Sequence, residues 1–556
     1  MSQPSAQHQP LSARKLQWQE TMRVLIVVAG GGYTNAAPLL ELGQLLSSRG
    51  YEIEFASLQG RETWVKDCAF VTRFHSLGPA VPAPVEEAKY LEMSTWSSDN
   101  WGAKTEARKF LESSWPDVYL SLSRLVNDAQ TRPDFLLAEY WVDAARDVSF
   151  EHDIPLAMHW SQMPTAILHA TYIPGTPGLQ AEILSSEHAS FWQRSRSSVA
   201  IYGCALHYYR YLQWRKRMRA TAGIHRALPT LSKPDYLCSV HSLFGVEVAK
   251  DLPPSVAAVG PILSDSVPEL QEPCCTFLAK RSRVLYIFLG THVLLPWASI
   301  EKLLCGALAV LASGGIDGII WPMRSMARKQ LNLEALLPVS APHSSSYAKL
   351  SELLSGAHPA VLLPEFAPQR SLLQDERVAV FLSHGGPASA NEALYAGVPL
   401  VTIAVYFDQA QNEMRLRDAG GSIPLDKDDF SAQEVGSALD RILQDKDAGG
   451  PISANVERMQ RIAMIASRRK HLAVGLVEEV LVDHQWRRRE RLAPESCLGD
   501  DSTDSKPRFM HLQTADVRMS TWKARNWDLL AANVAVVLCV AGLLVAVPVA
   551  VTQTLH

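Results

Sequence analysis

The sequence lacks a cysteine framework. Its eight cysteines are scattered along 556 residues, and only Cys274 and Cys275 are adjacent. This arrangement favours a reducing compartment, or thiols without a structural task, over a disulfide-stabilised secreted fold. No group of histidine, cysteine and acidic residues has metal-ligand spacing, so no metal site is expected.

An excess of positive charge is also lacking. The net charge is −4, which gives no reason to expect nucleic acid as a partner. A signal peptide is not indicated either, because residues 1–20 are polar and are predicted to form a disordered tail. The apolar run that follows, from Val24 to Ala29, is too short for a signal-peptide core and is predicted to be the first strand.

Length and composition predict two domains of roughly 200 to 250 residues each. The hydrophobic fraction of 47% and the charged fraction of 20% are those of an ordinary globular enzyme. In the N-terminal half, residues 23–35 read as a buried strand that enters a glycine-rich turn, and residues 38–50 read as an amphipathic helix with a glycine cap. These elements indicate an α/β fold.

The most informative segment is residues 366–409. An apolar run at 378–382 predicts a buried parallel strand, and Ser-His-Gly-Gly at 383–386 ends it. Pro387 then opens a helix at a position where its missing N–H costs nothing. The free N–H groups and the positive dipole end of such a helix form an anion site that suits a diphosphate.

Two further groups belong to this predicted site. Glu392 follows His384 by about two helical turns on the same face, where a carboxylate can accept bonds from ribose hydroxyls. A second buried strand at 400–405 leads to Asp408 and Gln409. Because ligands of open α/β sheets bind at the carboxyl ends of the strands, these two side chains are expected to bind sugar hydroxyls.

The spacing of these residues resembles the donor-binding signature of the family 1 UDP-glycosyltransferases. Phe366 stands where plant members have Trp, and the signature residues fall in register from there to Gln409 without insertion. Pro387 and Ala388 replace the Trp and Asn of the plant signature. The resemblance implies the GT-B fold, in which two Rossmann-like domains face each other across a cleft, and a UDP-sugar as co-substrate without a further cofactor.

The resemblance also implies roles for individual residues. Uracil would be bound by Phe366, Ala367 and Gln369. The diphosphate would be bound by His384, Gly386, Ser389 and Thr291, the ribose by Glu392, and the transferred sugar by Asp408 and Gln409. Glucose is the expected sugar, and glucuronic acid, galactose and xylose remain open.

The glycine-rich turn departs from the family pattern. Members usually have a His there that acts as general base on the acceptor, but alignment on Pro38 places Asn35 at that position, and asparagine cannot accept a proton. One hypothesis is that Glu139 acts as the base after desolvation raises its pKa. Asp143 and His159 are weaker candidates for this role.

Two alternatives to a carboxylate base remain open. The acceptor can be one that needs little deprotonation, such as an acidic phenol, a carboxylate, an amine or an electron-rich aromatic carbon, so that transfer to oxygen, nitrogen or carbon is open. In the second alternative, the chain is a catalytically silent relative that binds a UDP-sugar or a lipid and regulates a partner.

The C-terminus differs from the rest of the chain. The run from Leu529 to Val551 carries no charge and is long enough to span a bilayer as a helix. Arg518, Lys523 and Arg525 precede it, so the positive-inside rule predicts a single-pass anchor in the endoplasmic reticulum with cytosolic catalytic domains. A tethered enzyme suits a lipophilic acceptor such as a phenolic polyketide, terpenoid, sterol or lipid.

The predicted organisation follows from these segments. Residues 21–262 form the acceptor domain, 263–282 a linker, and 283–470 the UDP-sugar domain. A C-terminal helix occupies 471–495, a second linker 496–528 and a transmembrane helix 529–551. The predicted function is that of a eukaryotic, membrane-anchored UDP-glycosyltransferase that moves a hexose to a hydrophobic small molecule with inversion.

Overall fold

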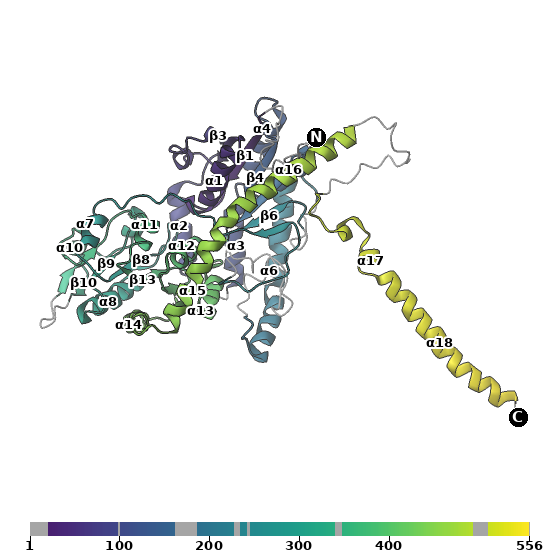
Figure 1. Ribbon diagram of the computed structural model, residues 1–556. Coiled ribbons are helices and arrows are strands. Elements are labelled where there is room, and N and C mark those ends of the chain that lie inside the picture. The colour runs from purple at the N-terminus through teal and green to yellow at the C-terminus, as the bar shows by residue number, and fades with distance from the viewer. Residues whose placement is uncertain are drawn as a thin grey trace, which may run out of the picture.

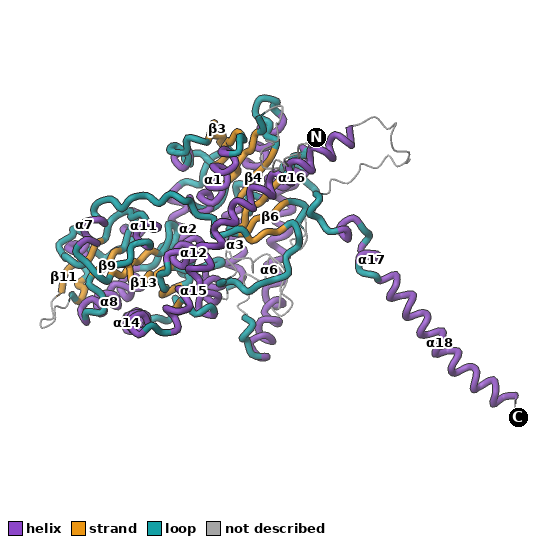
Figure 2. Tube along the Cα trace, viewed as in Figure 1, coloured by secondary structure: helices purple, strands orange, loops and turns teal. Residues whose placement is uncertain are grey.

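Two parallel α/β sheets form the body of the chain, one in each half of the sequence (Figure 1, Figure 2). The computed structural model describes residues 21–97, 100–161, 186–226, 234–241, 245–339, 347–492 and 510–554. The tail predicted for residues 1–20 lies outside the described residues, as do the first residues of the linker predicted for 496–528. The prediction of an α/β fold is confirmed.

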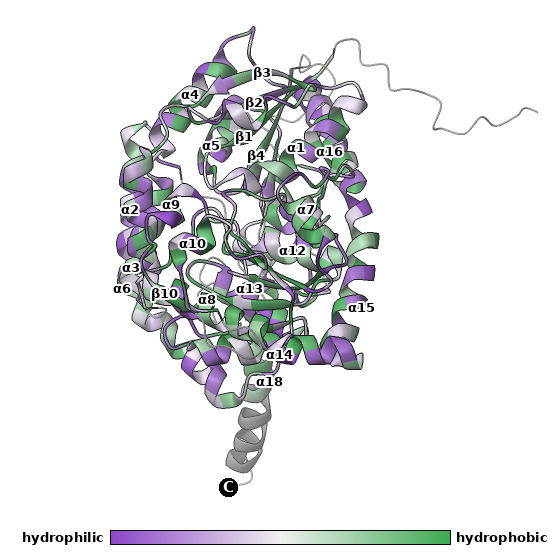
Figure 3. Cartoon of the chain, turned by 90° about the vertical axis from the view of Figure 1, so that its left-hand side faces the viewer, coloured by the Kyte–Doolittle hydropathy of each residue, from purple (hydrophilic) through white to green (hydrophobic). Residues whose placement is uncertain are grey.

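The N-terminal sheet has the strand order β3-β2-β1-β4-β5-β6-β7, and all neighbours in it are parallel. Its strands β1, β4 and β5 are buried along almost their whole length, as expected for a sheet that helices cover on both faces. Figure 3 colours β1 and β4 mainly as hydrophobic. The strands are β1 (Arg23–Val28), β2 (Glu52–Ser57), β3 (Val71–Ser76), β4 (Phe135–Glu139), β5 (Leu156–Trp160), β6 (Leu237–Val240) and β7 (Val256–Ala258).

The helices of this half are α1 (Tyr33–Ser48), α2 (Ala83–Ser94), α3 (Trp101–Glu112), α4 (Trp115–Asn127), α5 (Asp143–His152) and α6 (Phe191–Thr221), with a short 3-10 turn η2 (Glu62–Trp64). Helix α1 begins earlier than the sequence predicts, with Gly32 as its N-cap residue. Asn35 therefore belongs to the first turn of a helix and not to the glycine-rich turn itself. This position fixes the direction of its side chain.

The C-terminal sheet has the order β12-β9-β8-β13-β14-β15, again with parallel neighbours. Its strands are β8 (Val284–Phe288), β9 (Gly318–Ile320), β12 (Val361–Leu362), β13 (Val378–Ser383), β14 (Leu400–Ile403) and β15 (Ser422–Leu425). Strands β10 (Leu336–Pro338) and β11 (Tyr347–Lys349) form a separate antiparallel pair. The helices are α7 (Cys274–Ala279), α8 (Trp297–Ser313), α9 (Ser325–Arg328), α10 (Leu350–Leu354), α11 (Gln369–Leu373), α12 (Pro387–Ala396), α13 (Gln409–Asp418), α14 (Ala432–Ala448) and α15 (Pro451–Ala466).

Helix α16 (Lys470–Leu492), which follows the 3-10 turn η5 (Ser467–Arg469), returns from the C-terminal half to the N-terminal half and lies beside α1 (Figure 1, Figure 3). Val474 and Val477 share a buried core cluster with Leu39 of α1. At the start of α16, the Nζ of Lys470 donates to the Oε1 of Glu41 over 2.7 Å. Apolar packing and the buried Lys470–Glu41 ion pair thus join the two halves along α1 and α16.

The C-terminal segment contains the 3-10 turn η7 (Ala515–Arg518), α17 (Thr521–Ala524) and α18 (Trp527–Thr554), and α18 extends away from the body (Figure 1). The predicted helix is present, but its assignment as a transmembrane span is not supported by the described residues. No helix within the described residues is both long enough and apolar enough to cross a bilayer.

Candidate active site

A cleft lies between the two halves and is lined by residues of both. Its volume is about 1210 Å³, including the part open to solvent, which is sufficient for a nucleotide-sized ligand. Of the residues predicted for the site, the cleft is lined by Asn35, Thr291, Gln369, His384, Gly386, Ser389, Asp408 and Gln409. The others, which are Glu139, Asp143, Phe366, Ala367 and Glu392, are not among the described residues that line it.

The turn between β13 and α12 holds His384 in a narrow slot between two glycines. A Cβ atom on Gly386 would lie 2.3 Å from the Nε2 of His384, and one on Gly290 would lie 2.9 Å from the same atom. Gly385, with φ of +74°, allows the backbone to turn towards α12. Glycine is therefore needed on both sides of the ring for steric reasons.

His384 is uncharged in this slot. Burial, with a smaller contribution from nearby His292, lowers its pKa to about 4. Its Nδ1 is buried and has no hydrogen-bond partner among the described residues. A neutral ring with an unsatisfied nitrogen beside the N-terminus of α12 can bind an oxygen of an anionic ligand.

Gln369 connects two of the predicted donor-site residues. Its Nε2 donates to the Oε2 of Glu392 over 2.7 Å and to the Oγ of Ser389 over 3.3 Å. Burial raises the pKa of Glu392, and the bond from Gln369 opposes this rise. The side-chain amide of Gln369, at the start of α11, therefore fixes the carboxyl group of Glu392, which lies on α12 just beneath the cleft.

Phe366 and Ala367 lie between β12 and α11. Ala367 is buried against the core of the C-terminal half, whereas the side chain of Phe366 is 66% exposed. The structure thus offers a free aromatic face at the position that the signature predicts for base stacking.

Asp408 and Gln409 lie where β14 passes into α13. The Oε1 of Gln409 accepts hydrogen bonds from the backbone N–H groups of Val405 and Tyr406, at 2.9 and 3.2 Å. Asn412, which the sequence analysis missed, donates to the Oδ2 of Asp408 over 2.7 Å and to the carbonyl of Gly385 over 3.0 Å. The side-chain amide of Asn412 therefore connects the turn that carries Asp408 to the turn that carries Gly385.

On the opposite side of the cleft, Asn35 and Glu139 form a pair. The Nδ2 of Asn35 donates to the Oε1 of Glu139 over 3.4 Å, and the backbone N–H of Trp141 donates to its Oε2 over 2.8 Å. Glu139 is fully buried at the end of β4, and this burial raises its pKa to about 8 against the effect of these bonds. The carboxyl group lies behind Asn35 and is protonated at neutral pH.

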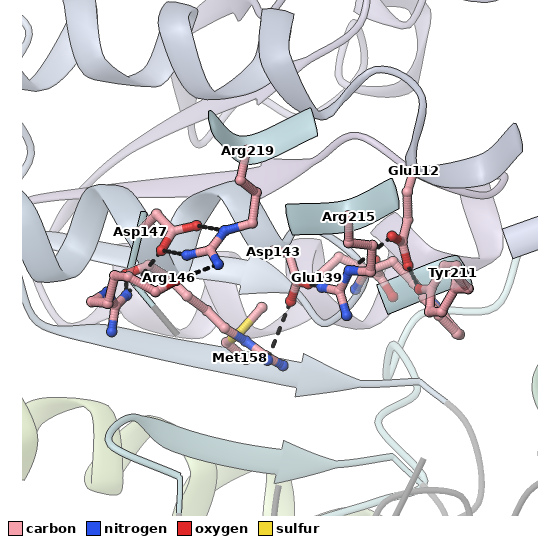
Figure 4. A network of polar contacts seen from close by, with 11 residues as sticks. Glu112, Glu139, Asp143, Arg146, Asp147, Met158, Tyr211, Arg215 and Arg219 are labelled. Atoms are coloured by element: carbon pink, nitrogen blue, oxygen red, sulfur yellow. Dashed lines mark hydrogen bonds and ion pairs between the residues drawn. The ribbon is translucent and has the colours of Figure 1, made fainter. Parts of the chain in front are cut away.

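Asp143, one of the predicted alternative bases, lies in a polar network outside the cleft lining (Figure 4). It forms ion pairs with Arg215 of α6 and, at 3.2 Å, with Arg146 of α5. Its carboxyl group is thus held between two arginines. These contacts indicate a structural role for Asp143 at the first residue of α5.

His159, the other weaker candidate, lies on β5 beside Glu139 in the strand register. Its Nδ1 is 3.0 Å from the Oγ of Ser239, and the whole ring is buried. Burial and the neighbouring His241 lower its pKa well below the ordinary histidine value. This residue is part of the sheet core beneath the cleft.

Comparison with known proteins decides the family. The family model described as "UDP-glucoronosyl and UDP-glucosyl transferase" matches residues 352–459. The chain is 35% identical to the UDP-glycosyltransferase FPY2 of Fusarium mangiferae, over 91% of this chain and 94% of that protein. It is 38% identical to the UDP-glycosyltransferase stmC of Aspergillus ustus, over 96% of this chain and 97% of that protein. The chain belongs to the UDP-glycosyltransferase family.

The architecture of this UDP-glycosyltransferase agrees with that of solved glycosyltransferases. The kitacinnamycin glycotransferase covers 82% of this chain and is itself covered to 98%, with a TM-score of 0.55 at 17% identity. A UDP-glucosyltransferase from Polygonum tinctorium covers 83% of this chain and is covered to 99%, with a TM-score of 0.53 at 17% identity. These likenesses confirm the GT-B arrangement of two α/β domains, and the relatives confirm a UDP-dependent glycosyltransferase.

The cleft of this UDP-glycosyltransferase contains residues that the sequence analysis missed, and they come from both halves of the chain. Tyr90 of α2 and His292, which follows β8, line the cleft together, and their rings stack at 4.8 Å. Trp141 and Phe407 add apolar surface from opposite halves of the chain. The sequence held one signal, a polar Thr-His pair shortly after the apolar run at 284–289, but the contact with α2 depends on the tertiary fold.

Proposed function

We propose that the protein transfers a hexose, glucose in the first place, from UDP to a hydrophobic aromatic small molecule by inverting displacement. Several observations on the donor side support this reaction. The N-terminus of α12, the neutral ring of His384 and Ser389 lie together at the cleft, where a diphosphate would lie. The exposed ring of Phe366 would stack on uracil, with Ala367 and Gln369 beside it.

In the same proposal, Glu392 accepts bonds from the ribose, and Asp408 with Gln409 binds the hexose hydroxyls. The carboxylate of Asp408 is positioned by Asn412, so it presents a fixed acceptor to the sugar. As the bond from the anomeric carbon to the diphosphate breaks, the charge that develops on the leaving group is stabilised by the helix N-terminus and by donors already in place.

The acceptor side of the cleft favours an aromatic substrate. Tyr90, Trp141 and Phe407 offer ring faces there, and Asn35 offers an amide that can orient a hydroxyl by hydrogen bonding. The Polygonum tinctorium neighbour is described as capable of glucosylating indoxyl and was solved with 3,4-dichloroaniline, both of which are aromatic. We therefore propose a phenol-type hydroxyl as the accepting group.

The observation that carries the proposal is that His384, Gly386 and Ser389, at the start of α12, line the same cleft as Asn35. The test is UDP release by the purified full chain from UDP-glucose with a panel of phenolic acceptors. UDP-glucuronic acid, UDP-galactose and UDP-xylose serve as competing donors, and calorimetry measures UDP affinity in parallel.

We expect UDP binding and turnover, with a product whose glycosidic bond is cleaved by acid, as an O-glycoside is. A product that resists acid would show that the accepting atom is carbon and not oxygen. UDP binding without turnover for any acceptor would favour the silent relative, and the absence of both would overturn the proposed function.

A further inference from the structure

The residues near the usual position of the general base lack a free basic atom that faces the acceptor. Asn35 has an amide in place of an imidazole, and Glu139 lies behind it and holds its proton up to about pH 8. Glu112, which also lines the cleft, has its carboxylate bound by Tyr211 and by Arg215 at 3.1 Å. None of these groups presents a free basic atom to an acceptor.

His292 belongs to the other half of the chain and lies in the cleft close to Asn35. It follows β8 and lines the cleft, and a Cβ atom added to Gly32 would lie 2.9 Å from its Cε1. The carbonyl of Gly32 accepts the backbone N–H of Asn35 over 3.0 Å, so His292 packs against the turn that starts the helix of Asn35. The ring thus lies between the donor half and the first turn of α1.

The environment of His292 orients the ring. One face stacks on Tyr90 at a centroid distance of 4.8 Å, and Nδ1 lies 3.2 Å from the Oγ1 of Thr291. The hydroxyl of Tyr406 donates to the backbone carbonyl of His292 over 2.5 Å. Nε2 makes no hydrogen bond to another described residue, and His292 lines the cleft.

We propose that His292 is a catalytic residue whose Nε2 takes the proton of the accepting hydroxyl as the oxygen attacks the anomeric carbon. The O–H bond breaks with its proton going to Nε2, the new oxygen–carbon bond forms, and the bond from the anomeric carbon to the diphosphate breaks, its electron pair leaving with UDP. The imidazolium then releases its proton to water. This role rests on the transfer reaction proposed above.

Thr291 completes the arrangement. In the tautomer that leaves Nε2 free, the Nδ1–H donates to the Oγ1 of Thr291, and the threonine hydroxyl is free to donate to a phosphate oxygen. The positive charge that His292 gains is then linked through Thr291 to the negative charge that the departing diphosphate gains. Both charges develop in the transition state, where such an interaction accelerates the reaction.

The charged groups around His292 are consistent with a base. Burial lowers its pKa to about 4, and Arg61 and Arg324 contribute in the same direction, so the free protein holds it neutral. His384 faces it from the β13 turn and is neutral too. A bound UDP-sugar adds negative charge nearby, which raises the pKa of His292 towards the working pH, where a general base is most effective.

The test compares the full-length wild type with His292→Gln on a series of substituted phenols of graded acidity, with UDP-glucose as donor. His471→Gln, at an exposed position on α16, is the matched control for the substitution. We expect His292→Gln to lose about 10²-fold or more in kcat with weakly acidic phenols and progressively less as the phenol becomes more acidic. The acid limb of the wild-type pH profile is expected to disappear, and UDP affinity to stay within a few-fold.

A second variant, His292→Ala, keeps the idea testable if glutamine disturbs the turn. Added imidazole is expected to restore part of its activity, since a free base can enter the space that the side chain leaves. A loss of activity that is equal for all phenols, unchanged activity, or a loss of UDP affinity as large as the loss of kcat would each overturn the role of His292. A wild type that binds no UDP would instead overturn the proposed function itself.

Discussion

Asn35 donates a hydrogen bond to Glu139, with 3.4 Å between Nδ2 and Oε1, so the polar pair beneath the acceptor side consists of an amide and a buried carboxyl group. An amide in this place can orient a hydroxyl but cannot remove its proton. The carboxyl group, whose pKa is raised to about 8, holds a proton of its own at neutral pH. The pair therefore positions an acceptor and leaves proton transfer to another group.

A pH-dependent stability follows from Glu139. Its pKa is raised by burial from 4.5 in the unfolded chain to about 8 in the folded protein, so the folded state keeps the proton where the unfolded state releases it. The contribution of Glu139 to stability is thus fully present below about pH 4.5 and is lost as the pH rises through about 8. Glu139→Gln removes this loss, and urea unfolding between pH 5 and 9 measures it.

We expect the free energy of unfolding of Glu139→Gln to exceed that of the wild type by a margin that grows with pH, several kcal/mol at most, since one pKa unit corresponds to about 1.4 kcal/mol. The kcat of the variant is expected to stay within a few-fold, because the amide can still bond Asn35. A margin that shrinks as the pH rises would contradict the raised pKa, and a kcat reduced by 10²-fold or more would restore Glu139 as the base.

The parts of the fold that the sequence predicted are those set by local patterns. The buried run Val24–Val28 and the run that ends at Ser383 are continuous apolar strands followed by glycine turns, and both are parallel strands in the structure. Proline at the first position of α12 marked that helix start correctly. Such patterns need no knowledge of distant contacts.

The features that the sequence did not predict depend on contacts between residues that are distant in the chain. His292 and Tyr90 are far apart in sequence, and only the facing of the two halves stacks their rings. Likewise, the spacing that places Glu139 at a strand end does not reveal that Asn35 stands between it and the cleft. The apolar run before Val551 predicted a helix correctly, but hydropathy alone led to a membrane span that the described residues do not support.

Gln369 provides a test of the donor side. Its replacement by alanine removes the 2.7 Å bond to Glu392 and the 3.3 Å bond to Ser389, and leaves the buried carboxyl group of Glu392 without this partner. We expect a loss in UDP affinity of roughly tenfold, because one hydrogen bond to a charged group contributes about 1.5 kcal/mol or more. Isothermal calorimetry with UDP gives the value.

The control for Gln369 is Gln374→Ala, a glutamine at the other end of α11 that is exposed. This variant is expected to bind UDP as the wild type does. Equal affinities for all three proteins would show that the amide has no part in forming the donor site.

Lys470 tests the joint between the two halves. Its Nζ bonds Glu41 at 2.7 Å and lies 2.8 Å from Asp265, and both Lys470 and Glu41 are buried. Lys470→Met leaves the carboxylate of Glu41 without its cation, so we expect a loss of about 3 kcal/mol in the free energy of unfolding, measured with urea. The double variant with Glu41→Leu is expected to recover much of this loss, whereas additive losses would show that the ion pair has no energetic role.

Gly386 tests the slot that holds His384. A Cβ atom at this position would lie 2.3 Å from the Nε2 of His384, although the backbone has an ordinary φ of −62° that alanine accepts without strain. Gly386→Ala therefore displaces the imidazole while the helix start remains. We expect UDP affinity to fall by about tenfold or more, with thermal stability close to that of the wild type.

The matched control for Gly386 is Gly475→Ala in α16, where an added Cβ meets nothing within 4 Å. This change is expected to leave UDP affinity unaltered and to stabilise the helix slightly, since alanine has the higher helix propensity. Because both variants add the same methyl group, a difference in UDP affinity between them reports on the histidine slot alone. Unchanged affinity in Gly386→Ala would mean that the diphosphate is bound without His384.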